Sequence, residues 1–171
     1  MARAARSNPN LTREAVIEAA ATVLEREGID GLTMRAVAAE LGVQAPALYW
    51  HVPSKEALQV ALYDHLMSGL AFTPTGDDWR EDLRRLAQTL RAQLLSRRDL
   101  ARLVPHGFFT GPNSLAHTET VLGVLIGAGL APRNAFYALA AGFTYVRRLA
   151  RGPAPPGPDP EIGRASCRER V

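Results

Sequence analysis

The chain has 171 residues and a formal net charge of +3, and 47% of its residues are hydrophobic. This length suits one hydrophobic core, or two small cores that share an interface, and the hydrophobic content excludes an intrinsically disordered chain. Between short segments with Gly and Pro, the sequence is rich in Ala, Leu, Arg and Glu, which favours helix over strand. We therefore expect an all-α protein.

The charge distribution does not by itself indicate a nucleic-acid partner. Residues 1–60 hold six Lys or Arg against seven Asp or Glu, a balance of −1, so the excess positive charge lies in residues 61–171. The histidines and the single Cys167 show no zinc-ligand spacing, and the longest apolar run, at 120–130, is far shorter than the ~20 residues of a membrane helix. We expect no metal, no cofactor, no membrane contact and a cytoplasmic location.

Two helices are predicted on the N-terminal side of the chain. Thr12 is placed to cap the first, whose apolar residues recur at helical spacing until Gly28 ends it. Thr33 is placed to cap the second, a short helix that Gly42 ends by adopting a left-handed conformation.

A third and a fourth helix follow directly. Pro46 suits the first turn of the third helix, where its missing N–H costs nothing, and this helix is predicted to run to about His51. Pro53 ends it, and Ser54 is placed to cap a fourth helix with leucines at helical spacing. The fourth helix is long enough to leave the first three and to reach the second half of the chain.

Past a loop at 71–78, the helical pattern resumes. Ser114 is placed to cap one of the later helices, and Pro132 opens the last. The predicted helices of this part cover residues 79–94, 99–104, 114–129 and 132–150. Residues 151–171 differ, because a Pro-rich linker is followed by a segment without apolar periodicity, which we interpret as a non-native tail.

The turn between the second and third helices suggests a DNA-binding motif. Two short helices separated by Gly42 and Val43 are typical of a helix-turn-helix, whose second helix enters the major groove with its N-terminal end. Small residues there allow close approach, and an alanine methyl group can contact a thymine methyl group, so Ala45 and Ala47 suit this role. Leu48 is expected to point inward.

The residues that follow suit the DNA backbone. Tyr49 and His51 have polar tips for phosphates, and Trp50 offers a broad apolar face to sugars or base edges. Lys55, at the start of the fourth helix, is placed to pair with a phosphate. The same spacing also fits a plain three-helix packing corner over residues 33–58, with Tyr49 and Trp50 as core aromatics.

Residues 11–66 closely resemble the DNA-binding domain of the tetracycline-repressor (TetR) family, above all in "GIDGLTMRAVAAELGV" followed by "PALYWHVPSKEAL". A weaker likeness to the family's ligand-binding domain continues to about residue 148. The resemblance implies a helix-turn-helix DNA-binding domain over 11–57 and a helical ligand-binding and dimerisation domain over 58–150, the latter incomplete. It also implies a ligand-released repressor that binds a palindromic DNA operator as a homodimer.

The resemblance further implies which residues contact DNA. Arg35, on the second helix, is the candidate for reading a guanine, and Tyr49, His51 and Lys55 are expected to fix the register. The DNA-contacting residues that we expect are Arg35, Gln44, Ala45, Pro46, Ala47, Tyr49, Trp50, His51 and Lys55.

For a small-molecule effector, the resemblance implies a cavity in the second half of the chain. Leu86 and Val121 stand where tetracycline-binding members of the family have polar groups, so a more apolar cavity and a different effector are expected. His106 lies close to, but not at, the position of a magnesium-binding histidine in those members, and we interpret it as a loop histidine without a metal. His117 is expected to lie on the surface or to line the cavity. The expected cavity residues are Leu86, Leu90, His106 and Val121.

Two other classes of function compete with this interpretation. An enzyme would need a nucleophile elbow, a phosphate loop or a metal-ligand spacing, and the sequence has none of these patterns, so we expect no catalysis. A helical protein-interaction module that has lost DNA binding stays an alternative, because the first 60 residues are nearly neutral. The family dimerises through its last two helices, and the chain ends before the last of them, so we expect weak dimers or poor solubility.

Overall fold

The computed structural model describes residues 11–103 and 111–151, and within these two ranges every regular element is a helix. The helices are α1 (Arg13–Gly31), α2 (Met34–Glu40), α3 (Ala45–Leu48), α4 (Lys55–Met67), α5 (Trp79–Leu95), α6 (Leu100–Leu103), α7 (Pro112–Gly127) and α8 (Pro132–Arg151). The expected all-α fold is confirmed. In these two ranges, no helix is both long enough and apolar enough to cross a membrane.

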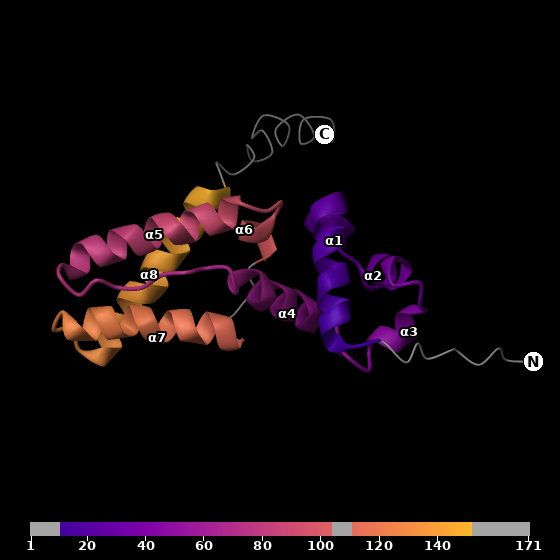
Figure 1. Ribbon diagram of the computed structural model, residues 1–171, viewed down its shortest axis with the longest axis horizontal. Coiled ribbons are helices and arrows are strands. Elements are labelled where there is room, and N and C mark those ends of the chain that lie inside the picture. Colours follow the sequence, from indigo (N-terminus) through magenta and orange to yellow (C-terminus); the bar gives the residue numbers. More distant parts are fainter. Residues whose placement is uncertain (1–10, 104–110, 152–171) are drawn as a thin grey trace, which may run out of the picture.

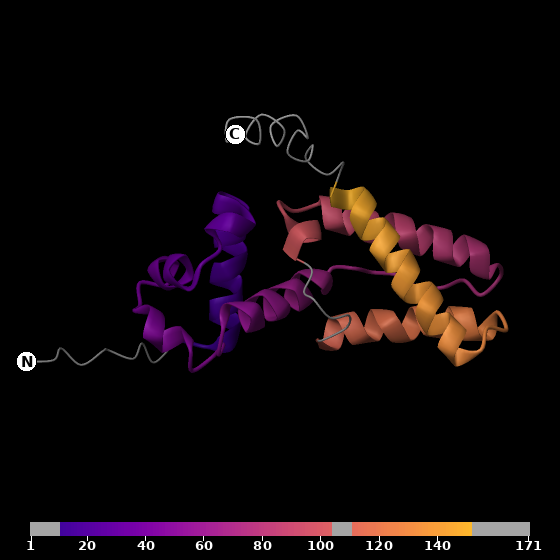
Figure 2. The same ribbon diagram turned by 180° about the vertical axis from the view of Figure 1, so that it is seen from behind.

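The helices form two groups that α4 joins (Figures 1 and 2). At one end of the molecule, α1 packs against α2 and α4, and α2 packs against α3. At the other end, α8 crosses both α5 and α7. The short α6 lies beside α4, α5 and α8. The predicted domain boundary between residues 57 and 58 falls within α4, so this helix belongs to both groups.

Side-chain caps set the starts of α1, α2 and α4. The hydroxyl oxygens of Thr12, Thr33 and Ser54 each accept a hydrogen bond of 3.1 Å from the backbone N–H three residues further along the chain. Such a bond satisfies one of the N–H groups that a helix leaves unpaired at its start. The three predicted caps are therefore confirmed.

The helix predicted from Pro46 to about His51 is shorter than expected. Regular α3 ends at Leu48, and the N–H groups of His51 and Val52 both donate to the Leu48 carbonyl at 2.9 Å. Val52 is 1% exposed, so burial of its side chain draws the chain back toward the core. The residues between Leu48 and Val52 consequently project from a tight, hydrogen-bonded turn.

α7 begins at Pro112 rather than after the predicted cap, Ser114. The acceptor for its first N–H groups comes from Asp64 on α4, whose carboxylate oxygens lie 2.8 Å from the nitrogen of Ser114 and 3.4 Å from that of Asn113. Gly111, at the N-cap position, permits this approach, because a Cβ there would lie 2.0 Å from the Cγ of Asp64. A side chain from a distant helix thus replaces the predicted local cap.

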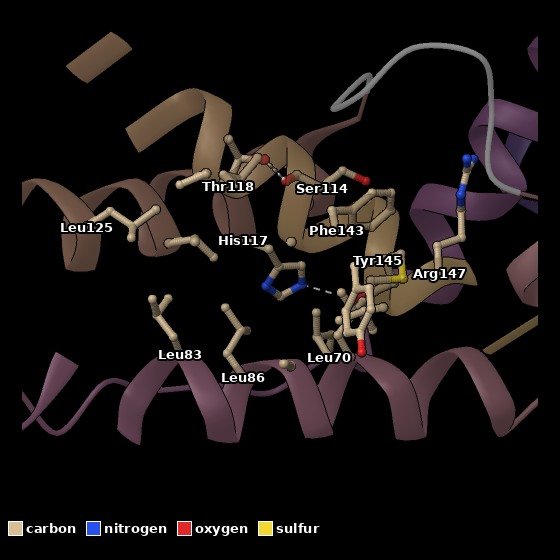
Figure 3. A pocket seen from close by; sticks show the side chains of 18 of the residues that line it. Leu70, Leu83, Leu86, Ser114, His117, Thr118, Leu125, Phe143, Tyr145 and Arg147 are labelled. Carbon is tan, nitrogen blue, oxygen red and sulfur yellow. Dashed lines mark hydrogen bonds between the residues drawn. The ribbon is translucent and has the colours of Figure 1, made fainter. Parts of the chain in front are cut away.

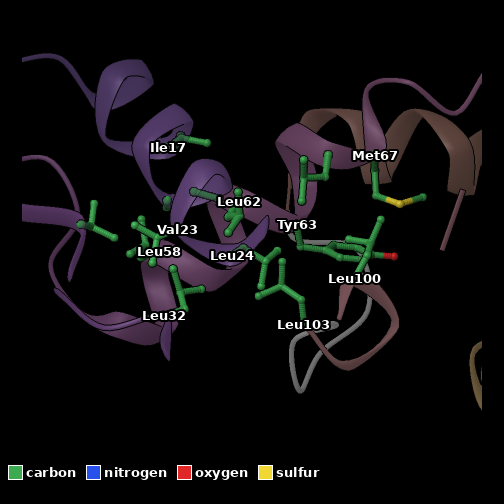
Figure 4. Packing of buried hydrophobic residues seen from close by; sticks show 14 of the residues in the cluster. Ile17, Val23, Leu24, Leu32, Leu58, Leu62, Tyr63, Met67, Leu100 and Leu103 are labelled. Carbon is green, nitrogen blue, oxygen red and sulfur yellow. The ribbon is translucent and has the colours of Figure 1, made fainter. Parts of the chain in front are cut away.

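One hydrophobic cluster runs through both groups of helices (Figure 4). It includes Leu24 of α1, Leu62 of α4, Leu94 of α5 and Leu100 of α6, each no more than 2% exposed. A smaller cluster joins α7 to α8, and its buried members are Leu125, Ala135 and Leu139. Because close packing transmits small displacements, a shift of α4 must be accommodated at both ends of the molecule.

Candidate functional site

The turn after α3 exposes two aromatic side chains. Trp50 is 90% exposed and Tyr49 is 50% exposed, whereas Leu48 beside them is fully buried. The alternative in which both aromatics are core residues of a packing corner is therefore wrong. Trp and Tyr side chains are enriched at contact surfaces, because they combine a large apolar area with a polar tip. This turn is thus free to contact a partner.

Several side chains on α2, on α3 and in the two flanking turns are exposed, and we call this set the α3 edge. Its members are Arg35, Gln44, Pro46, Tyr49 and Trp50. The α3 edge lies at the end of the molecule away from α5, α7 and α8 (Figure 1). Ala45, Ala47 and His51 are only partly buried, and Ala45 also packs against the core.

Lys55 lies on a different surface from the α3 edge. Its side chain is partly buried and lines a cleft of about 380 Å³ between α1, α4, α6 and α8. Asp30, Arg102 and Arg151 line the same cleft, so its basic side chains outnumber its acidic one. The phosphate contact predicted for Lys55 stays a prediction.

A pocket of about 290 Å³ lies between α5, α7 and α8, beside the C-terminal end of α4 (Figure 3). Leu83 and Leu86 project into it from α5, and Phe143 lines it from α8. Most of the other lining side chains are aliphatic as well, and no carboxylate occurs among the lining residues that the structure describes. Concave apolar pockets with a few polar groups are the usual sites for small molecules.

Two polar side chains of the pocket are bonded to nearby backbone. The Nε2 of His117 lies 3.1 Å from the carbonyl oxygen of Met67, in the last turn of α4. The hydroxyl of Thr118 donates to the carbonyl of Ser114 at 2.8 Å. Burial raises the pKa of the Tyr63 hydroxyl above its usual value, so this group stays protonated and uncharged.

α4 is hydrogen-bonded to two walls of the pocket. Asp64 accepts from the first N–H groups of α7, and the side-chain amide of Asn113 also donates to its carboxylate at 3.1 Å. From α5, the side chain of Gln93 donates to the carbonyl of Leu66 at 2.7 Å. Together with the contact of His117, these bonds make the end of α4 part of the pocket structure.

A separate set of bonds holds the C-terminal end of α1 to the turn between α5 and α6. Asp99 accepts from the backbone N–H of Ile29 at 3.0 Å, and this bond lowers the pKa of Asp99 below its usual value. The guanidinium of Arg98 donates to the carbonyl of Arg26 at 3.0 Å. Gly28, with φ of 78° and ψ of −178°, is non-helical and ends the first stretch of α1 as predicted, and Asp99 holds the short turn that follows it.

Comparison with known proteins identifies both groups of helices. Residues 16–62 match bacterial regulatory proteins of the tetR family, and residues 73–150 match a tetracyclin repressor-like C-terminal domain. The crystal structure of the TetR-family protein ActR from Streptomyces coelicolor, in complex with (S)-DNPA, is 30% identical to this chain. Its TM-score is 0.77, and the match covers 82% of this chain and 70% of ActR. The chain belongs to the TetR family.

Other TetR-family proteins show similar likeness. Tetracycline repressor protein class D from Escherichia coli is 37% identical over 134 residues, which cover 77% of this chain and 61% of that repressor. The chain therefore spans about three fifths of the length of the curated relatives that it matches. The crystal structure of BioQ with its double-stranded DNA operator is 32% identical, with a TM-score of 0.73 over 82% of this chain and 86% of BioQ.

The expected effector residues of this TetR-family chain fall into two groups. Leu86, Leu90 and Val121 all line the pocket, and their contact with an effector stays a prediction. His106 lies outside the described residues. Within the described ranges, no cluster of His, Cys, Asp or Glu is arranged to hold a metal ion. The bond between His117 and α4 could not be predicted, because helical periodicity does not place a backbone carbonyl.

Proposed function

We propose that this chain is the DNA-binding and effector-sensing part of a ligand-released transcriptional repressor, which acts on double-stranded DNA in the cytoplasm. The observation that carries the proposal is Trp50, 90% exposed on the turn after α3. It lies at the opposite end of the molecule from an apolar pocket, and α4 connects the two (Figure 1). The proposal assigns the chain no catalytic reaction, in keeping with relatives that are transcriptional regulators.

In this proposal, the α3 edge enters the major groove of the operator. Gln44 and Pro46, exposed at the N-terminal side of α3, approach the base edges, and Arg35 on α2 donates two hydrogen bonds to a guanine. Trp50 packs on the sugars, and Tyr49 bonds to a phosphate. The complex of BioQ with its operator supports this docking mode for a chain of the same fold.

The proposed effector is a small and largely apolar molecule. The pocket of about 290 Å³ is lined mainly by apolar side chains, which suit an apolar ligand. ActR, a relative of similar fold, was crystallised with the small molecule (S)-DNPA. Tetracycline is not proposed, because Leu86 and Val121 offer the pocket no polar groups at these positions.

The proposed release mechanism requires that the effector binds one position of α4 better than another. An effector in the pocket touches α7, whose first turn is bonded to Asp64 of α4. If α4 shifts, the α3 edges of the two subunits change their separation. Because half-sites on one face of DNA lie ~34 to 36 Å apart, a shift of a few Å is enough to lose contacts on both sides.

A second copy of the chain is the proposed partner for the exposed side of α8. Tyr137, Tyr145 and Leu149 are 56%, 64% and 49% exposed on this helix, and helical spacing places them on one side of it. Several large apolar side chains exposed on one helix are typical of a surface that pairs with another subunit. Homodimer formation also explains why a palindromic operator is expected.

The test selects operator duplexes from a random-sequence DNA pool with the full-length protein, and then measures their affinity in a mobility-shift assay. Lys55→Ala should weaken all duplexes by a similar factor, whereas Arg35→Ala should reduce the preference for the selected sequence. Arg91 on α5 is exposed and distant from the α3 edge, so Arg91→Ala is the matched control. It should change neither the affinity for the duplexes nor the preference for the selected sequence.

The proposal predicts enrichment of an inverted repeat with half-sites about ten base pairs apart. Failure to enrich any sequence, with no shift even at low salt, would favour the alternative of a helical protein-interaction module. If duplexes are bound and both Lys55→Ala and Arg35→Ala leave binding unchanged, the assigned contacts are wrong.

A further inference from the structure

His117 presents one of its two ring nitrogens to the interior of the pocket (Figure 3). Its imidazole extends from α7 into the space above Leu83 and Leu86 of α5. Nε2 is directed to the carbonyl oxygen of Met67 at 3.1 Å, and Nδ1 faces the apolar side of the pocket. The two nitrogens therefore have different environments.

The contact with Met67 decides the chemistry of Nδ1. A carbonyl oxygen only accepts hydrogen bonds, so Nε2 must carry the proton in this contact. In a neutral imidazole the other nitrogen is then an acceptor, with its lone pair in the plane of the ring. Nδ1 of His117 thus offers the pocket a hydrogen-bond acceptor of fixed position.

We propose that His117 determines the specificity of the effector pocket, and that the effector is a largely apolar molecule that donates an O–H or N–H hydrogen bond to Nδ1. This inference rests on the proposed function, since it names the chemical class of the effector. An acceptor left without a donor inside an apolar pocket is unfavourable, so the site discriminates against ligands of similar shape that lack the donor.

The remainder of the lining disfavours a cationic ligand. No carboxylate lines the pocket among the described residues, so a cationic ligand would find no counter-charge. Arg147 lines the pocket at one end, where its Nε is buried without a hydrogen-bond partner, and its guanidinium is directed away from His117 (Figure 3). The hydroxyl of Thr118 already donates to the Ser114 carbonyl, which leaves His117 as the better-placed polar contact on α7.

The contact between His117 and Met67 also connects the ligand to α4. Because Met67 lies in the last turn of α4, the Nε2 bond joins the ring that reads the ligand to the helix that carries the α3 edge. A donor bound at Nδ1 fixes the orientation of the imidazole and therefore the direction of its bond to Met67. Ligand recognition and the position of α4 are thus linked through one side chain.

The experiment uses two probes of nearly the same shape. 2-Naphthol carries one hydroxyl donor, and 2-methoxynaphthalene has a methyl group in place of that hydrogen. Binding of each to the full-length protein without DNA is measured by equilibrium dialysis at pH 8, where histidine side chains are ordinarily neutral. The wild type should bind 2-naphthol about five- to tenfold more tightly than 2-methoxynaphthalene, the contribution of one hydrogen bond.

His117→Phe keeps a flat ring of similar size and removes the acceptor, so the preference should fall below about twofold while 2-methoxynaphthalene binds as before. Thr120→Val, one turn further along α7 and outside the lining of the pocket, is the matched control and should keep the preference. Leu86→Trp fills the pocket and should weaken both probes alike. Thermal unfolding checks that each variant is folded.

Three results would overturn the inference: equal binding of the two probes by the wild type, an unchanged preference in His117→Phe, or no binding of either probe. Because these measurements contain no DNA, their failure is distinct from failure of the proposed function, which the operator selection tests by itself.

Discussion

At the scale of single residues, two side chains close together in the sequence, at the end of α3 and in the turn after it, differ completely in burial. Leu48 is fully buried and holds α3 against the core, whereas Trp50 is 90% exposed and contributes no packing there. Both residues are large and apolar, so hydrophobicity alone does not separate them. Their difference comes from the backbone turn, which returns to the core at Val52.

This contrast predicts opposite effects of two alanine substitutions. Trp50→Ala should change the free energy of unfolding by less than about 0.5 kcal/mol and should weaken operator binding. Leu48→Ala should cost about 2 to 5 kcal/mol of stability, because it leaves a cavity in the core. Urea denaturation measures the free energy of unfolding of both variants, and a mobility-shift assay measures operator binding by Trp50→Ala. Equal destabilisation by both substitutions would show that Trp50 is a packing residue.

Asp82, near the start of α5, is a buried carboxylate with several donors. It is 1% exposed and accepts from the backbone N–H groups of Thr75 and Gly76 and from the Thr75 hydroxyl, each at 3.0 Å, with Arg85 as an ion-pair partner. These bonds lower the pKa of Asp82 far below its usual value, and the bond from the Thr75 backbone N–H makes the largest contribution. The carboxylate fixes the loop before α5 to the helix.

A lowered pKa makes the stability from Asp82 depend on pH with a definite sign. The contribution is complete above the unfolded pKa of about 3.9, and it is lost as the pH falls further toward the lowered folded pKa. Asp82→Asn should therefore be less stable than the wild type at pH 7 and should lose less stability between about pH 4 and pH 2. Urea titrations across this range, with the exposed Asp77→Asn as control, check the difference.

At the scale of helices, α4 takes part in both ends of the molecule. Its N-terminal part packs on α1, and its C-terminal part is bonded to α5 and α7. One of these contacts joins Asp64 to the first N–H groups of α7, and Gly111 leaves the space that it needs. Movement of α4 and movement of the α7 end of the pocket are therefore mechanically coupled.

A double-mutant cycle tests the contact between Asp64 and Gly111. Gly111→Ala alone should be strongly destabilising, because its Cβ would lie 2.0 Å from the Asp64 Cγ. Asp64→Ala alone should cost about 1 to 3 kcal/mol, since it leaves helix N–H groups without an acceptor. In the Asp64→Ala background, Gly111→Ala should cost much less, and urea denaturation gives the coupling energy. Additive effects would contradict the contact.

The sequence predicted those features of the helices that depend on nearby residues. Thr12, Thr33 and Ser54 cap helices through bonds three residues along the chain, and capping preferences describe such local contacts. The start of α7 was predicted wrongly because its cap is Asp64, which is distant in sequence. The short turn that follows Gly28 in α1 was not predicted either, because it depends on Asp99, which only the tertiary fold brings to it.

In the candidate sites too, features set by nearby residues could be predicted, and features set by residues distant in sequence could not. Exposure of Trp50 could be expected once the helix-turn-helix pattern was seen, because its position in the turn is local. The role of His117 could not, since it depends on the Met67 carbonyl of another helix. Periodicity predicts which faces are apolar, but it does not predict which polar atoms meet inside the pocket.

At the scale of the whole molecule, the exposed side of α8 determines whether two α3 edges can act on one operator. Leu149 on α8 and Leu95 on α5 are exposed to nearly the same degree, at 49% and 50%. Only Leu149 lies on the proposed subunit contact. The two leucines therefore form a matched pair for testing it.

Leu149→Lys should weaken self-association of the full-length protein, because it places a charge in an apolar contact. Leu95→Lys should leave the association unchanged. Analytical ultracentrifugation at micromolar concentrations measures both. Equal sedimentation of the two variants and the wild type would show that α8 is not the subunit contact.

The central claim is that the α3 edge faces DNA, and the exposed Trp50 reports on it directly. In a Trp79→Phe background, Trp50 is the single tryptophan of the chain, and acrylamide quenching of its fluorescence measures its access to solvent. Quenching should be strong for the free protein and should fall severalfold when a selected operator duplex is bound. Unchanged quenching in a sample whose duplex is fully bound would contradict the claim.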